Sequence, residues 1–327
     1  MLRLSLALAS AVLACSAAER IDNVLIRLVP ENSVSLFGAQ MEQVKATPLY
    51  QKLMSQQQLP QLDEFAATTN FDPRRDVREL LIASNLKAKS GVLLARGNFR
   101  ISADSLAKMK DMRKAGYRGY TLWTNPAQDA GFCILDSTLA IAGPLETMHA
   151  ALDRYQQQHA GPIQTPLIQK ALTIPMRNQV WMVSMGGSDF LTNNLPGAGN
   201  GANFGRIFRN LENTEFQADL SRGFYARVHG MCRTDADAKS LADAARGLVG
   251  FGRLSVPDSQ PQLLRVWDAI QVEQQARDIT VSADIPGDLV EKLIQLFDGG
   301  QKQANGRSSS YSSAGELRHP ESTRHPH

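Results

Sequence analysis

Cysteine and histidine are the residues of this chain whose chemistry would suit nucleophilic catalysis or metal binding, and both are scarce. The sequence holds three cysteines and six histidines. Cys133 could act with His149, and Cys232 with His229, as a thiol and its base. His229 and Cys232 are three residues apart, however, and on a strand such residues point to opposite faces. No two histidines of the folded region have metal-ligand spacing. We therefore predict no catalytic, cofactor-binding or metal site, which leaves enzymatic activity without support.

Two glycine-containing segments could bind anions. Residues 197–205 are rich in glycine but lack the Lys-Ser or Lys-Thr ending of a Walker phosphate loop, so they are interpreted as a surface loop or a ligand lid. Arg100 and Arg233 each precede a predicted helix, whose first N–H groups favour anions. The alternative is structural: Gly97 and Gly230 bend the chain at a strand end, and small polar residues cap the helix that follows.

These two arginine-containing corners are copies of one pattern. Four residues of the first copy recur in the second at a constant displacement of 133 positions: Gly97, Arg100, Ala103 and Asp104 match Gly230, Arg233, Ala236 and Asp237. Pro144 and Pro286 also open corresponding helices. We therefore predict an internal duplication, with repeats at 22–160 and 161–298.

The N-terminus has the pattern of a bacterial export signal. Residues 4–14 form a short apolar segment that follows a positive charge, and we assign residues 1–18 to a cleaved signal peptide. Residues 12–15 resemble a lipobox, which would make Cys15 the lipidated first residue of the mature protein. Alternatively, cleavage after 16–18 would release a soluble protein. Both alternatives predict a periplasmic or membrane-anchored location in the cell envelope.

Export to an oxidising compartment makes a disulfide between Cys133 and Cys232 feasible. Each cysteine lies in an apolar, strand-like run, so two buried free thiols are the alternative.

Composition excludes other classes of function. With 35 basic and 32 acidic residues the chain is nearly balanced in charge, and it has no dense basic stripe for nucleic acid. Beyond the N-terminus no segment is long and apolar enough to span a bilayer. Residues 299–327 contain almost no large apolar side chains, which predicts a disordered tail.

Hydrophobic periodicity predicts an α+β fold. We expect two duplicated domains, each an antiparallel sheet with helices packed on one face, in the order strand, helix, two strands, helix, two strands, helix. The first expected strand is 24–29. Ser102 should cap one helix, and Asp235 or Thr234 the equivalent helix of the second repeat.

Several short segments carry a family resemblance. The signal, residues 30–34 (Pro-Glu-Asn-Ser-Val), the turn at 70–77 (Asn-Phe-Asp-Pro-Arg-Arg-Asp-Val) and the corner at 97–99 resemble exported bacterial proteins and lipoproteins of unknown function with an internally duplicated α+β domain. The resemblance covers about residues 24–297 and implies no activity, so no functional residue is carried over.

Three functions remain as hypotheses. The first is a non-enzymatic envelope protein that acts as a scaffold or interaction module with an envelope protein as partner. The second is a periplasmic carrier, which requires a continuous apolar pocket between the two repeats for a small or apolar ligand. The third is an exported hydrolase, which requires a histidine or paired carboxylates in a cleft.

Overall fold

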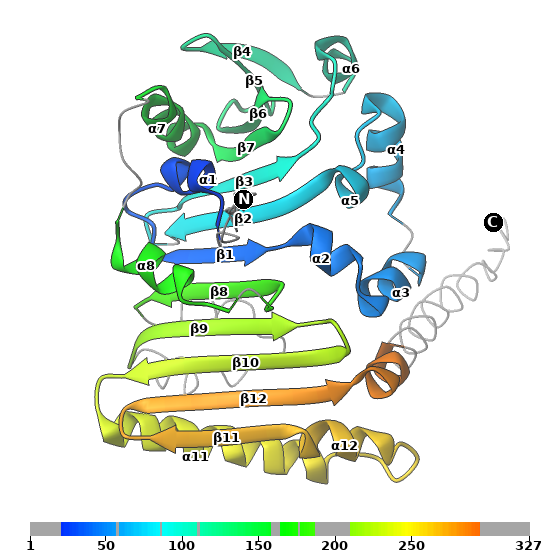
Figure 1. Cartoon of the computed structure of the whole chain (residues 1–327), viewed down its shortest axis with the longest axis vertical. Helices are drawn as coiled ribbons and strands as arrows, with labels where there is room; N and C mark the ends of the chain where they lie inside the picture. Colours follow the sequence, from blue (N-terminus) through cyan, green and yellow to red (C-terminus); the bar gives the residue numbers. More distant parts are fainter. Residues whose placement is uncertain are drawn as a thin grey trace, which may run out of the picture.

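The structure is a computed structural model that describes residues 21–56, 59–85, 87–109, 112–157, 164–175, 177–186 and 210–294. It is a mixed α+β fold built on one large antiparallel sheet (Figure 1). The predicted signal with Cys15, the glycine-rich segment 197–205 and the predicted tail lie outside the described residues.

The sheet runs from edge to edge in the order β11-β12-β10-β9-β8-β1-β2-β3-β7-β6-β5-β4. Its strands in chain order are β1 (Ser35–Ala39), β2 (Val77–Asn85), β3 (Ser90–Gly97), β4 (Arg113–Tyr117), β5 (Tyr120–Thr124), β6 (Ala130–Asp136), β7 (Leu139–Pro144), β8 (Val180–Met185), β9 (Leu211–Asp219), β10 (Gly223–Cys232), β11 (Ile270–Gln275) and β12 (Asp278–Pro286).

Helices connect and cover these strands. They are α1 (Asn23–Leu28), α2 (Met41–Lys45), α3 (Pro48–Gln56), α4 (Pro60–Thr69), α5 (Pro73–Asp76), α6 (Ala103–Ala107), α7 (Leu145–Gln156), α8 (Pro166–Leu172), α11 (Asp235–Leu254) and α12 (Gln262–Asp268). A further helix begins at Gly287, and its described part ends at Ile294.

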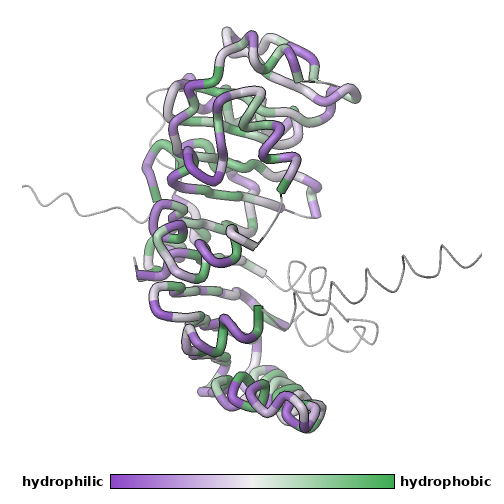
Figure 2. Tube along the Cα trace, turned by 90° about the vertical axis from the view of Figure 1, so that its right-hand side faces the viewer, coloured by the Kyte–Doolittle hydropathy of each residue, from purple (hydrophilic) through white to green (hydrophobic). Residues whose placement is uncertain are grey.

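The two faces of the sheet carry different helices. Leu36 and Trp181 face the main hydrophobic core, where they pack with buried residues of α1, α7 and α8. Because side chains alternate along a strand, Leu80 and Leu93 face the other way, toward α2, α3 and α4. The register across β8, β9, β10 and β12 puts Ile279, which packs against α11, on this second face as well. Seen along the strands, the sheet forms a tall narrow body with α11 and α12 at its foot (Figure 2).

Of the two repeated corners, only the first ends its strand at the glycine, as predicted for both. Gly97 is the last residue of β3, and Gly230 lies two residues before the end of β10. A Cβ atom at Gly97 would meet the Asp76 backbone carbonyl oxygen at 2.5 Å, so close approach favours glycine there. A Cβ atom at Gly230 would meet the end of the Leu211 side chain, Cδ2, at 2.7 Å, so that side chain would have to shift. Ser102 caps α6, as predicted.

The cap of α11 is Thr234, one of the two residues that the sequence offered. Its hydroxyl accepts a hydrogen bond from the Asp237 backbone N–H at 3.1 Å and donates one to the Asp237 carboxylate at 2.7 Å. The Asn210 side chain also donates to Asp237. Removing the hydroxyl leaves an N–H at the end of a 20-residue helix without its acceptor.

Thr234→Ala should therefore lower the free energy of unfolding by about 1 kcal/mol, as measured by urea denaturation. Ser102→Ala is the matched control. It should have a smaller effect because α6 has only five residues and a shorter packed surface. An equal or larger effect of Ser102→Ala would contradict this assignment.

Four sequence predictions about the fold are wrong. Residues 24–29 belong mostly to α1 rather than to a strand, because the Asp22 carboxylate accepts the Val24 N–H and starts a helix. One sheet joins both predicted repeats, since β1 pairs with β8, where the sequence predicts a separate sheet in each. Helices also cover both faces of this sheet instead of one. The sequence pattern also predicts one hairpin from strands at 117–123 and 132–142, but this region forms four strands, β4 to β7.

Candidate functional site

An apolar trough lies on the second face of the sheet, with a volume of about 480 Å³. Its floor consists of cross-strand neighbours on β6, β7 and β3. Ala142 pairs with Phe132 on one side and Leu93 on the other. Ala140 pairs in the same way with Ile134 and Ala95. Because alanine is small, the floor is low at its centre.

The side walls of the trough come from the helices between β1 and β2. Met41 stands at the start of α2, and Tyr50 and Met54 are one helical turn apart on α3. Phe71 and Phe99 also line the trough, as a stacked pair with ring centroids 5.2 Å apart. The trough is open to solvent over Leu93, which is 37% exposed. An apolar floor of this size open to water is typical of a ligand site.

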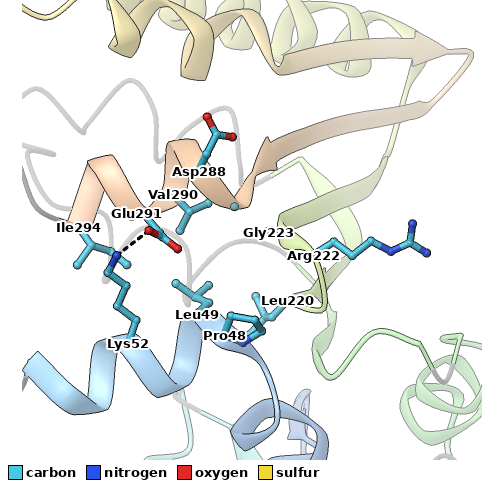
Figure 3. A pocket seen from close by; sticks show the side chains of 11 residues that line it. Pro48, Leu49, Lys52, Leu220, Arg222, Gly223, Asp288, Val290, Glu291 and Ile294 are labelled. Carbon is cyan, nitrogen blue, oxygen red and sulfur yellow. Dashed lines mark hydrogen bonds and ion pairs between the residues drawn. The ribbon is translucent and has the colours of Figure 1, made fainter.

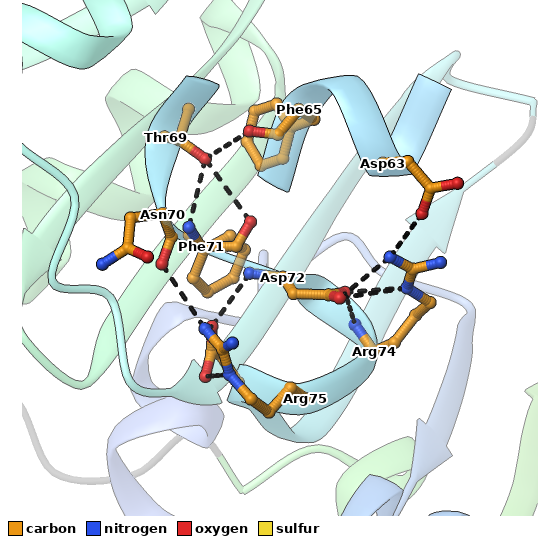
Figure 4. A network of polar contacts seen from close by, with 9 residues as sticks. Asp63, Phe65, Thr69, Asn70, Phe71, Asp72, Arg74 and Arg75 are labelled. Atoms are coloured by element: carbon orange, nitrogen blue, oxygen red, sulfur yellow. Dashed lines mark hydrogen bonds and ion pairs between the residues drawn. The ribbon is translucent and has the colours of Figure 1, made fainter. Parts of the chain in front are cut away.

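A polar network borders the trough where the chain passes from α4 through α5 into β2 (Figure 4). The Arg74 guanidinium donates to Asp72 at 2.9 Å and to Asp63 at 2.8 Å. Arg75 pairs with Asp76 at 2.7 Å. The hydrogen bond from Arg74 holds the pKa of Asp72 below its ordinary value, and the one from Arg75 does so for Asp76. Both carboxylates are therefore ionised at neutral pH.

A smaller cleft of about 260 Å³ lies between the two predicted repeats (Figure 3). Leu49 of α3 faces Val290 and Ile294 of the helix that begins at Gly287, and Lys52 bridges to Glu291 at 2.7 Å. The carrier hypothesis requires an apolar ligand pocket at this position, between the two repeats. This cleft is smaller than the trough and has charged residues at its rim, so the apolar volume lies within the first repeat instead.

Comparisons with known proteins add little to this geometry. No family model and no curated protein matches the sequence. Crystal forms III, I and IV of TP0453, a Treponema protein, are similar in structure. Form III has 11% identity and a TM-score of 0.49, and the match covers 79% of this chain and 92% of that one. For form I the identity is 12% and the TM-score 0.46, and the match covers 84% of this chain and 96% of that one. For form IV the identity is 11% and the TM-score 0.49, and the match covers 82% of this chain and 95% of that one. We infer neither fold nor function from similarity at this level.

The residues predicted to bind anions are both exposed. Arg100 lies in the turn before α6, and Arg233 in the turn before α11. The Arg233 backbone N–H donates to the Asn210 carbonyl, which ties this corner to the start of β9. Anion binding by either arginine stays a prediction.

The two cysteines are buried free thiols, one of the two alternatives that the sequence left open. Cys133 on β6 belongs to the main core, whereas Cys232 on β10 belongs to the cluster under α11, so they cannot form the proposed disulfide. Burial raises the pKa of Cys133 to about 11 and also raises that of Cys232. Neither thiol is therefore activated as a nucleophile. His149 stacks on Tyr117 with ring centroids 3.8 Å apart.

Paired carboxylates occur in a polar cleft of about 410 Å³ at one end of α1. The Asp22 carboxylate accepts hydrogen bonds from Arg96 Nε and Nη2, each at 3.0 Å, and one from the Val24 N–H at the start of α1. Burial raises the pKa of Glu79, while hydrogen bonds from the Asp22 backbone and Gln40 oppose the shift. These contacts fasten the start of α1 to β2 and β3, which is a structural role for both carboxylates.

A charged cluster links α8 to the second half of the sheet. Lys170 of α8 pairs with Glu215 of β9 at 2.5 Å. His229 of β10 lies 3.7 Å from Glu215 and 3.0 Å from Asp278. His229, followed by Lys170, lowers the pKa of Glu215 to about 2 although burial opposes this. Glu215, followed by Asp278, raises the pKa of His229 against the effect of burial.

This cluster predicts a pH optimum of stability. The His229 pKa is raised by folding, so its contribution is complete below the unfolded pKa of about 6.5 and is lost as pH rises through the folded value. The Glu215 pKa is depressed, so its contribution is complete above the unfolded value of 4.5 and is lost as pH falls toward 2. Wild-type protein should therefore be most stable between about pH 4.5 and 6.5 with respect to these groups.

Urea denaturation at pH 5.5 and pH 8 measures the alkaline part of this effect. His229→Gln should reduce the difference between the free energies of unfolding measured at the two pH values. Glu215→Gln should lower the free energy of unfolding at pH 5.5 by about 1–3 kcal/mol. His149→Gln is the control, since His149 contacts a tyrosine ring and not this cluster. If the free energy of unfolding of His229→Gln changes between pH 5.5 and pH 8 as much as that of the wild type, the assignment is contradicted.

Within the described ranges, no three His, Cys, Asp or Glu residues are arranged to hold a metal ion. Among the same residues, no helix combines the length and the apolarity needed to cross a bilayer. The trough was missed at the sequence level, because its floor is an ordinary alternating strand pattern. The available signal was the alternation of small Ala140 and Ala142 with large Leu139 and Ile141.

Proposed function

We propose that this chain is a non-enzymatic, exported carrier that binds a small apolar ligand in the trough on the second face of the sheet. The observation that carries the proposal is the open apolar floor between β6 and β3, with Leu93 exposed above it. Leaving such a surface in water is unfavourable by roughly 25 cal/mol for each Å² of apolar area, and a ligand that covers it recovers this free energy. Export rests on the N-terminal signal pattern.

Native mass spectrometry of protein purified without detergent from its own cells tests the proposal. The expected result is a bound small molecule that is released on denaturation. Protein that carries no adduct and also fails to bind added apolar probes would contradict it.

A scaffold or interaction module is the second candidate, and a different surface favours it. Leu248, Phe251 and Leu254 recur every three residues near the end of α11, and the last two are 69% and 88% exposed. Large apolar side chains gathered on one helix are typical of a protein interface. A photo-crosslinking amino acid at Leu254 should capture one specific envelope protein in cells, whereas the same label at the exposed Lys87 should not. Equal capture at both positions would contradict this candidate.

We also propose that the sheet arose by duplication. Adding 133 to the residue numbers of β3 gives 223–230, which are the first eight residues of β10. Outward from the β1–β8 pair, each side of the sheet continues with a hairpin, β2–β3 or β9–β10. Each hairpin is followed by a strand that leads directly into a helix, β7 or β12. Aligned sequences of relatives should show the two halves matching at this same displacement, and a different displacement would contradict the duplication.

A further inference from the structure

The rim of the trough points to the charge of its ligand. We infer that the trough takes an uncharged apolar molecule, with at most a hydroxyl or carbonyl group, and discriminates against anionic amphiphiles such as fatty acids. This inference rests on the proposed carrier function and narrows it to a ligand class.

Arg74 is the only charged residue among the described residues that line the trough. An anionic headgroup would therefore depend on it. Its guanidinium already donates from Nε to Asp72 at 2.9 Å and from Nη2 to Asp63 at 2.8 Å (Figure 4). One cation thus faces two carboxylates, and an added anion would meet their repulsion.

The neighbouring cations are also engaged. Arg75 donates from Nε and Nη2 to Asp76 at 2.8 and 2.7 Å. The Lys45 ammonium donates to the backbone carbonyls of Arg75 and Val77. An anionic headgroup would compete with Asp76 for Arg75 and with the two carbonyls for Lys45, whereas an uncharged ligand leaves these contacts intact.

Tyr50 supplies the other polar side chain on the lining. Burial, helped by the nearby Asp72, raises the pKa of Tyr50, so its hydroxyl stays protonated at neutral pH. A phenol can donate to or accept from a ligand hydroxyl or carbonyl without any change in charge. The lining therefore offers one neutral hydrogen-bonding group and no uncompensated cation among its described members.

A series of probes with one chain and different headgroups tests the inference. Displacement of neutral 1-aminoanthracene from the full-length protein at pH 7 would be measured with 1-dodecanol, dodecanoate and dodecyltrimethylammonium. We expect dodecanol to bind at least about tenfold more tightly than dodecanoate. Dodecanoate binding as tightly as dodecanol would overturn the inference while leaving the carrier function intact. Displacement by none of the three would count against the carrier function itself, as would a trough covered by another part of the chain.

Asp63→Asn provides the decisive variant, because it removes one of the two carboxylates on Arg74. It should strengthen dodecanoate binding about two- to fivefold and leave dodecanol binding unchanged. Asp243→Asn is the matched control, since Asp243 pairs with Arg246 on α11 and is similarly exposed. If Asp63→Asn changes the affinities for dodecanoate and dodecanol equally, the inference fails. It also fails if Asp243→Asn strengthens dodecanoate binding as much as Asp63→Asn does. Thermal unfolding of each variant verifies that the fold is retained.

Discussion

Replacing Ala142 by tryptophan should abolish binding of apolar probes to the trough. The Ala142 side chain lies on the floor between Phe132 and Leu93, where an indole would fill the space that a ligand would occupy. We expect the dissociation constant for 1-aminoanthracene to rise at least about 100-fold, which corresponds to roughly 2.7 kcal/mol. The free energy of unfolding should change by less than about 1 kcal/mol, because the ring enters open space and covers apolar surface.

Fluorescence titration and urea denaturation of the same samples measure these two effects separately. Ala88→Trp is the control, since Ala88 is exposed in the β2–β3 turn, and it should bind the probe like wild type. Ala142→Leu adds a smaller side chain and should give an intermediate loss of binding. Probe affinity that stays at the wild-type level in Ala142→Trp would exclude the trough as the binding site.

Local patterns were sufficient for most of the elements. The hairpins β2–β3 and β9–β10 follow from alternating apolar residues on either side of polar turns, and the starts of α6 and α11 follow from capping residues. The segment 70–76 is predicted as a turn, but Pro73–Asp76 form the short helix α5. The predicted side-chain bonds are present, since Asp72 and Asp76 accept backbone N–H groups there.

The failure at residues 24–29 has a definite physical cause. A short apolar run with β-branched residues fits a buried strand or a buried helix equally well by periodicity. The deciding residue is Asp22. Its carboxylate accepts a hydrogen bond from the Val24 N–H and forms an ion pair with Arg96. Arg96 is 74 residues away in sequence, so the partner that supports this helix start is not visible locally.

The single sheet and the trough could not be predicted for a related reason. β1 and β8 pair although about 145 residues separate them, and each has the pattern of a strand that could equally belong to its own sheet. The trough exists because helices leave part of one face uncovered, which depends on where α3 and α4 pack and not on the strand pattern itself. Sequence periodicity indicates which residues share one face of a strand, but it does not indicate which helices pack against that face.

The β1–β8 junction gives the prediction with the largest effect on stability. Gly38 lies directly opposite Trp181 in this register, and the Trp181 side chain is 1% exposed within the main core. A Cβ atom at position 38 would approach the indole ring atoms closer than 3.0 Å. The ring is rigid and surrounded by packed residues, so it cannot move aside without disturbing the core.

Gly38→Ala should therefore lower the free energy of unfolding by about 3 kcal/mol or more in urea denaturation. Gly116→Ala on edge strand β4 is the matched control, because nothing lies within 4 Å of its added Cβ, and it should change stability by no more than about 0.5 kcal/mol. Combining Gly38→Ala with Trp181→Leu should recover part of the loss, so the two substitutions should not be additive. Among the described strands, β1–β8 is the pair that joins the two halves of the sheet, so Gly38→Ala should also separate the unfolding transitions of the halves. A Gly38→Ala protein as stable as Gly116→Ala would mean that the indole does not rest on the Gly38 backbone.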